Sequence, residues 1–245
     1  MDNGWRLFTD GLAAERNLNW DAALDGFRKC DADKDFIDSI CKVAIVSTEL
    51  RKFDFSAAKA DIDVAVSRYP KDHSVLAEGI FVNLLFGNTA DADHLHEVMK
   101  ATEPQPQDES SNCLYYYGRN EASLASSHCQ AAIRNNENEY EVWSNAGYVA
   151  LDNRDFQSAI DYFSKAAQLF YNSKNKHTVT QELDVSWGIL IAEYYLGDKK
   201  KAKNLYRELK KDCPQFMNTT ALKQLPLVWS DYTVKLFDII VADWR

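Results

Sequence analysis

The chain has 245 residues, a formal net charge of −9 and an apolar fraction of 46%. The acidic balance argues against nucleic acid as the main partner, because phosphate binding needs clustered lysine and arginine. We find no apolar run of about 18 residues and no basic-then-apolar start, so we expect no membrane span and no signal peptide. This favours a cytoplasmic location, unless a signal was removed. Only 9 glycines and 5 prolines occur, which favours an all-helical chain.

Six alanines recur at nearly constant spacing along the chain. The separations are 35, 34, 33, 34 and 43 residues, between Ala23, Ala58, Ala92, Ala125, Ala159 and Ala202. A period of about 34 residues is typical of stacked helical hairpins, each of which buries its apolar face against its neighbours. The longer last separation predicts the same unit with an insertion.

Small and apolar residues stand at matching offsets in the successive units. In chain order they are Gly11, Trp20, Phe27 and Cys30, then Phe55, Ile62, Ala65 and Pro70, then Leu76, Gly87, Met99 and Pro104, then Cys113, Tyr117, Cys129 and Ala132, and in the sixth unit Gly197, Tyr206, Leu209 and Pro214. The prolines come where a helix is expected to end.

The fifth unit shows both of its helices most clearly. One helix face carries Trp143, Ala146, Gly147 and Ala150. After a polar break at 152–155, a second face carries Phe156, Ala159, Phe163 and Ala166. The small residues allow two antiparallel helices to approach closely enough for bulky side chains to interdigitate.

The fifth unit resembles the tetratricopeptide repeat, which carries the same residue types at the offsets of Trp143, Gly147, Ala159, Phe163 and Ala166. The resemblance implies an all-α, right-handed α-solenoid of antiparallel helix pairs. It covers about six divergent units over residues 1–214, with an insertion near 172–180. Residues 215–245 are expected to form a capping helical segment.

The end of that capping segment is expected to be an amphipathic helix at 230–244. One of its faces carries Val234, Phe237, Val241 and Trp244. This helix either packs on the sixth unit or provides a surface for self-association.

In this family the first helix of each unit lines a concave face. The resemblance therefore implies a peptide-binding groove with the anchors Trp5, Phe8, Phe81, Tyr117, Tyr148, Trp187 and Tyr194. The groove is also acidic, through Glu15, Glu78, Glu141, Asp152 and Asp184. Aromatic side chains on a rigid wall suit an apolar or basic peptide or helix. The alternative is that some of these residues pack within the stack or against the end helix. A clamp for a terminal carboxylate is not expected, because only Arg16 and Arg51 place cations near this face.

These observations predict a non-catalytic scaffold or adaptor with a protein or peptide partner. Two alternatives stay open: a self-assembly module that forms a homodimer through the C-terminal helix, and an enzyme that uses the solenoid as a substrate platform. The sequence has no Cys-x-x-Cys pair and no glycine-rich phosphate loop, and His94 and His96 fall on different faces of a helix. We therefore expect no catalytic residues, no metal site and no cofactor.

Two cysteine pairs are candidates for disulfides. Cys113 faces Cys129 across one hairpin, and Cys30 and Cys41 lie at the end of one helix and the start of the next. Each pair is able to approach the Cα separation of about 5.5–6 Å that a disulfide needs. The alternative is that cysteine fills small buried positions as alanine does. Oxidation of both pairs would indicate a periplasmic or secreted protein, with Cys213 left single.

Overall fold

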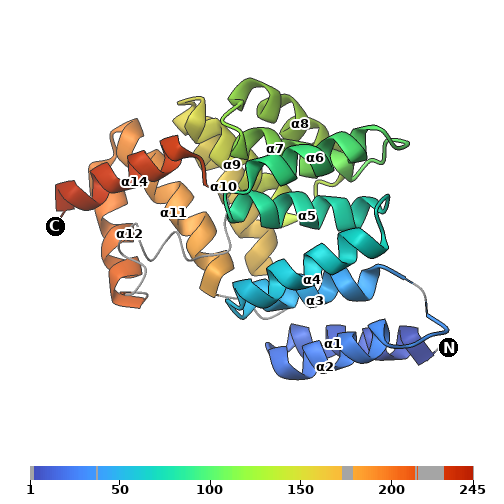
Figure 1. Ribbon diagram of the computed structural model, residues 1–245. Helices are drawn as coiled ribbons and strands as arrows, with labels where there is room; N and C mark the ends of the chain where they lie inside the picture. The colour runs from blue at the N-terminus through green and yellow to red at the C-terminus, as the bar shows by residue number, and fades with distance from the viewer. Residues whose placement is uncertain (1–2, 37, 173–178, 213, 215–228, 245) are drawn as a thin grey trace. The chain divides into compact units, whose positions relative to one another are not determined.

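The computed structural model describes residues 3–36, 38–172, 179–212, 214 and 229–244 (Figure 1). These residues contain thirteen α-helices, labelled α1 to α12 and α14, and no strand. They divide into two compact units, one up to Gln105 and the other from Pro106 onward. The all-helical class expected from the sequence is confirmed.

Helices that follow one another in the chain pack in pairs. The first unit contains α1 (Asn3–Arg16), α2 (Trp20–Asp31), α3 (Ile40–Arg51), α4 (Phe55–Arg68), α5 (His73–Leu85) and α6 (Thr89–Lys100). The second contains α7 (Asp108–Gly118), α8 (Ala122–Asn135), α9 (Tyr140–Asp152), α10 (Phe156–Asn172), α11 (Val179–Leu196), α12 (Lys199–Asp212) and α14 (Asp231–Trp244). We call the odd-numbered member of each pair its A helix and the even-numbered member its B helix.

The six alanines of the repeat all lie on B helices and are fully buried. Small residues on the A helices complete the close packing. A Cβ atom added to Gly147 of α9 would come within 2.7 Å of the Phe163 ring on α10. Gly188 of α11 approaches the same ring from another helix. Glycine at both positions therefore leaves room for one fully buried phenylalanine between α9, α10 and α11.

Every turn from an A helix to its B helix uses a residue with positive φ. The six are Leu18, Phe53, Gly87, Asn120, Arg154 and Gly197, with φ between 59° and 108°. Each precedes its pair's buried alanine by five positions, as Leu18 precedes Ala23. The next residue caps the B helix in several pairs: the side chain of Asn19, for example, accepts a hydrogen bond from the amide of Ala22.

The longer spacing between the fifth and sixth pairs begins as additional helix. Helix α10 has 17 residues and runs to Asn172, whereas α4 and α8 have 14 residues each. Most of the insertion expected near 172–180 lies outside the described residues, which resume at α11.

Helix α14 lies across α11, with its first turn toward α9 (Figure 1). Its buried face consists of Thr233, Leu236, Phe237, Ile240 and Val241. The expected packing on the sixth pair is found, and it extends to α9. Residues 215–228 of the expected capping segment lie outside the described residues. Of the apolar run at 239–241, only Ile239 is exposed, and self-association through this helix stays a prediction.

Candidate functional site

The three aromatic anchors expected in the first unit differ in exposure. Trp5 of α1 is 45% exposed, whereas Phe8 on the same helix is buried. Phe81 of α5 is half-buried. The Trp5 ring lies edge-on to Phe8, with centroids 5.9 Å apart, and edge-on to Phe36 at 5.3 Å. Trp5 and Phe81 therefore present apolar surface to solvent, and Phe8 belongs to the core of its unit.

The four anchors expected in the second unit are brought together on its A helices α7, α9 and α11. They are Tyr117, Tyr148, Trp187 and Tyr194, and all four are buried. The sequence placed them on an exposed wall. The structure instead covers that wall with α14, so the chain's own helix occupies the position expected for a partner. We call these four side chains, together with Ile191, the A-helix face of the second unit.

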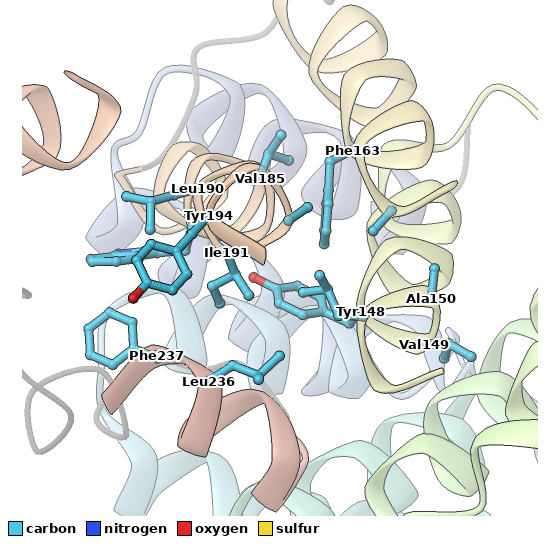
Figure 2. Close-up of a cluster of buried hydrophobic side chains, with 14 of the residues drawn as sticks. Tyr148, Val149, Ala150, Phe163, Val185, Leu190, Ile191, Tyr194, Leu236 and Phe237 are labelled. Carbon is cyan, nitrogen blue, oxygen red and sulfur yellow. The ribbon is translucent and has the colours of Figure 1, made fainter. Parts of the chain in front are cut away.

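Aromatic contacts join α14 to this face along most of its length. Phe237 meets Trp187 edge to face, with centroids 4.3 Å apart. Figure 2 shows Leu236 and Phe237 directed toward the side chains of Ile191 and Tyr194. At the last turn, the ring centroid of Trp244 lies 5.2 Å from that of Tyr194. The apolar face of α14 is thus matched to aromatic rings of the A helices.

A buried polar cluster fixes the first turn of α14. Ser230 donates its backbone N–H to the Tyr117 hydroxyl at 3.0 Å and its own hydroxyl to Asp152 Oδ1 at 2.7 Å. Thr233 donates its hydroxyl to the same Asp152 oxygen at 3.0 Å and its backbone N–H to Ser230 Oγ at 3.0 Å. Tyr117 in turn donates to Thr233 Oγ1 at 3.2 Å. Ser230 is thus the N-cap of α14, and the carboxylate of Asp152 lies beside the positive end of the helix dipole.

Burial perturbs the carboxyl groups near this face. It raises the pKa of Asp152 to about 6, although the hydrogen bonds from Ser230 and Thr233 oppose the rise. Burial also raises the pKa of Asp184 on α11 to about 6. Asp184 accepts a hydrogen bond from the Ser144 hydroxyl at 2.5 Å, and its backbone carbonyl accepts one from the Tyr148 hydroxyl at 2.7 Å. These acids lie within the packing of the second unit instead of lining an open groove.

Two indole N–H groups beneath α14 remain unsatisfied. Nε1 of Trp187 and Nε1 of Trp229 are buried and have no hydrogen-bond partner among the described residues. A buried donor without an acceptor costs about 1–3 kcal/mol. The fit between α14 and the A-helix face is therefore good in shape and incomplete in hydrogen bonding.

The acidic residues expected on the first unit's A helices already have partners. Glu15 of α1 forms an ion pair with Arg51 of α3. Glu78 of α5 accepts a hydrogen bond from the Ser47 hydroxyl at 3.0 Å, and burial raises its pKa. Because neighbouring side chains engage these two carboxyl groups, the exposed surface of the first unit's A helices is more apolar than the sequence suggests.

Each cysteine pair expected from the sequence lies within one unit. The Cα atoms are 6.0 Å apart for Cys30 and Cys41 and 4.8 Å apart for Cys113 and Cys129. In both pairs the sulfur atoms lie within bonding distance of each other. The first pair connects α2 to α3, and the second connects α7 to α8. Oxidation of these thiols in solution stays a prediction.

The described residues do not contain a group of three or more His, Cys, Asp or Glu side chains placed to hold a metal ion. A small hollow of about 90 Å³ lies between α8, α9 and α10. It is smaller than the roughly 300–1,000 Å³ of ordinary ligand pockets. Among the described helices, none combines the length and the apolar character that crossing a membrane would require.

Sequence reasoning assigned no contact to three residues that hold α14 on the A-helix face: Trp229, Ser230 and Thr233. A local signal for the start of α14 was present, because a serine directly before an amphipathic run is a typical N-cap. The partners of Ser230 had no such signal, since Tyr117 lies 113 positions earlier in the chain.

No family model matches the chain, and no curated protein matches it in sequence. Solved structures are similar in fold. A tetratricopeptide repeat protein from Parabacteroides merdae has a TM-score of 0.52 at 10% identity, covering 98% of this chain and 92% of that one. PilW, a type IV pilus biogenesis factor, has a TM-score of 0.59 at 11% identity, covering 87% and 96%. The Cut9–Hcn1 structure of the APC/C has a TM-score of 0.65 at 11% identity, covering 99% and 46%. The chain therefore has the fold of the tetratricopeptide repeat proteins.

Proposed function

We propose that the chain is a non-catalytic protein-interaction scaffold whose A helices bind an amphipathic helix of a partner protein. The observation that carries the proposal is the packing of α14, an amphipathic helix that lies against α9 and α11 and is held on α11 by aromatic contacts and on Tyr117 by hydrogen bonds. The tetratricopeptide repeat fold of similar structures supports an interaction scaffold in general.

The first unit presents equivalent positions that are partly open. Phe81 of α5 precedes Tyr148 of α9 by 67 residues, about two repeat periods, and therefore has the same register in its helix. Trp5 adds a second aromatic side chain, 45% exposed. Because the net charge is −9, long-range attraction favours a partner helix with a basic outer face.

The proposal is tested by selecting a displayed library of helical peptides on the full chain. We expect enrichment of sequences with apolar residues at i, i+3, i+4 and i+7 and with lysine or arginine between them. Amide hydrogen exchange then locates the bound peptide. Protection is expected on A helices, whereas no enrichment, or protection confined to B helices, would contradict the proposal.

Peptides that protect the amides of α1, α3 and α5 from hydrogen exchange allow a matched mutational test. The double variant Trp5→Ala with Phe81→Ala should lose most of their affinity, since each buried aromatic anchor contributes about 1.5–3 kcal/mol. Tyr171 of α10 is 61% exposed and lies on a B helix, so Tyr171→Ala is the control and should bind normally. Equal loss in both variants would show that exposed aromatic area in general, and not this face, determines binding.

A further inference from the structure

We infer that α14 is a displaceable occupant of the second unit, and that a foreign amphipathic helix of the same pattern takes its place on the A-helix face. This inference rests on the proposed function and adds its regulation. The chain would then bind such a partner only in the fraction of molecules whose α14 has left the face.

The contacts of α14 specify the pattern that a competitor must carry. A capping Ser or Thr stands at its start, where Ser230 meets Asp152 and Tyr117. Large apolar residues follow at positions +6, +7, +10, +11 and +14 from that residue, as do Leu236, Phe237, Ile240, Val241 and Trp244. The residues between Leu236 and Trp244 that do not belong to this apolar set are Asp238, Ile239, Ala242 and Asp243, and all four are exposed. This is one amphipathic helix of four turns, a common form for a peptide ligand.

The incomplete hydrogen bonding of α14 leaves room for a better ligand. Trp187 belongs to the face itself, and in the part of the chain that the structure describes no acceptor reaches its buried Nε1 atom. Trp229 precedes α14, and its indole N–H would regain water when the helix leaves. A foreign helix with a side-chain carbonyl or carboxylate near Trp187 would satisfy a donor that α14 leaves unsatisfied.

Asp152 favours the same kind of competitor. Its carboxyl group is buried under the first turn of α14, where two hydroxyl groups are its hydrogen-bond donors. A helix with lysine or arginine in its first turn would supply a charged donor instead, and a carboxylate binds a charged donor more strongly than a neutral hydroxyl group. The expected partner is therefore basic at the end of its helix that meets Asp152.

The alternative occupant is α14 of a second copy of the chain. An exchanged α14 would make the same contacts as the chain's own helix and would leave the same two indole groups unsatisfied. It would gain nothing over the intramolecular contact and would lose the advantage of being tethered. These contacts favour a foreign helix.

The test measures binding of a labelled synthetic peptide, residues 229–245, to three full-length chains. In one chain Phe237→Asp weakens the packing of α14 on the A-helix face, because Phe237 is fully buried against Trp187. In the control chain Ile239→Asp adds the same charge to the exposed side of the same helix. The third chain is the wild type. We expect the peptide to bind the Phe237→Asp chain at least about tenfold more tightly than the other two.

The outcomes separate the inference from the proposed function. Equal binding to all three chains would overturn displacement by α14 and leave helix binding intact. No binding to the Phe237→Asp chain, shown by circular dichroism to be folded, would overturn helix binding itself. A wild-type dimer that dissociates when α14 is weakened, seen by sedimentation, would assign the face to a second copy and overturn the foreign helix.

A milder variant covers the case in which Phe237→Asp does not fold. Ser230→Ala with Thr233→Val removes hydroxyl groups from the first turn of α14 and leaves its apolar face unchanged. This chain should also bind the peptide more tightly than the wild type. A peptide that itself carries Phe237→Asp should bind none of the chains, and binding equal to that of the unmodified peptide would overturn the inference.

Discussion

The ring of Phe237 on α14 stands edge-on to the ring of Trp187 on α11, with the two centroids 4.3 Å apart and both side chains fully buried. The C-terminal helix is therefore part of the second unit's core as well as a cover for its A helices. Stability and access to the A-helix face are coupled at this contact.

The first prediction concerns the energy of that contact. Phe237→Ala should lower the free energy of unfolding by about 3–5 kcal/mol, because it removes a buried aromatic side chain and leaves a cavity. Ile239→Ala, on the exposed side of α14, should change it by less than about 0.5 kcal/mol. Urea denaturation followed by circular dichroism measures both. Similar small effects would mean that α14 does not pack in solution as described.

The second prediction concerns pH. Burial raises the pKa of Asp184 to about 6 and that of Glu49 on α3 to about 7, whereas the unfolded chain has ordinary values near 4. Between about pH 4 and 6 the folded state therefore binds more protons than the unfolded state, and the free energy of unfolding falls as pH rises. Each group contributes a slope approaching about 1.4 kcal/mol per pH unit.

Amide substitutions test this dependence. Asp184→Asn and Glu49→Gln remove two of the buried titrating groups and should each reduce the slope of the stability profile, the second up to about pH 7 because burial raises the pKa of Glu49 to about 7. Part of the slope should remain, because burial also raises the pKa of Asp152 to about 6. Denaturant midpoints measured from pH 4 to 8 give the slope. A wild-type protein that becomes more stable across that range would contradict the described burial of these carboxyl groups.

The third prediction concerns the turns between A and B helices. Gly197 has φ of 108° and Gly87 has φ of 72°, and an added Cβ would meet no atom within 4 Å at either position. Backbone conformation alone therefore decides the effect of alanine. Gly197→Ala should cost about 1–2 kcal/mol, and Gly87→Ala less, because its φ is closer to the left-handed well. Melting temperatures rank the variants, and the reverse order would contradict the described turn geometry.

The fourth prediction concerns the cysteines. If both described pairs are oxidised, four of the five thiols are blocked, and one thiol, that of Cys213, remains. A thiol assay on chain denatured without reductant should therefore find one reactive group. Five reactive groups would show that the paired cysteines fill small buried positions as thiols. One group would favour a periplasmic or secreted location.

The repeat pattern was sufficient to predict the helix pairs and to predict which anchor residues lie on the same surface. Small residues at fixed spacing, such as Gly147 and Ala159, specify which helix faces meet, and this local information extends through the whole chain. It correctly brought Tyr148 and Trp187 to one surface. The prediction that these two side chains are exposed was wrong, because exposure depends on what covers the surface.

The position of α14 could not be derived in the same way. The repeat ends before α14, so no spacing relates Phe237 to the helices beneath it. Its contacts join residues far apart in the chain, as Tyr194 and Asp243 are joined by a hydrogen bond of 2.9 Å across 49 positions. Such contacts depend on shape and on the total area buried, which one sequence does not display.

The constant distance of five residues from each positive-φ turn to its alanine shows where the chain tolerates added sequence. Between Arg154 and Gly197 the chain has 43 residues instead of about 34, yet Gly197 still stands five positions before Ala202. The distance from the turn to the alanine is thus fixed, and the added length lies between Ala159 and Gly197. An engineer who wishes to splice a fluorescent domain or an epitope into this protein should place it where a B helix passes to the next A helix.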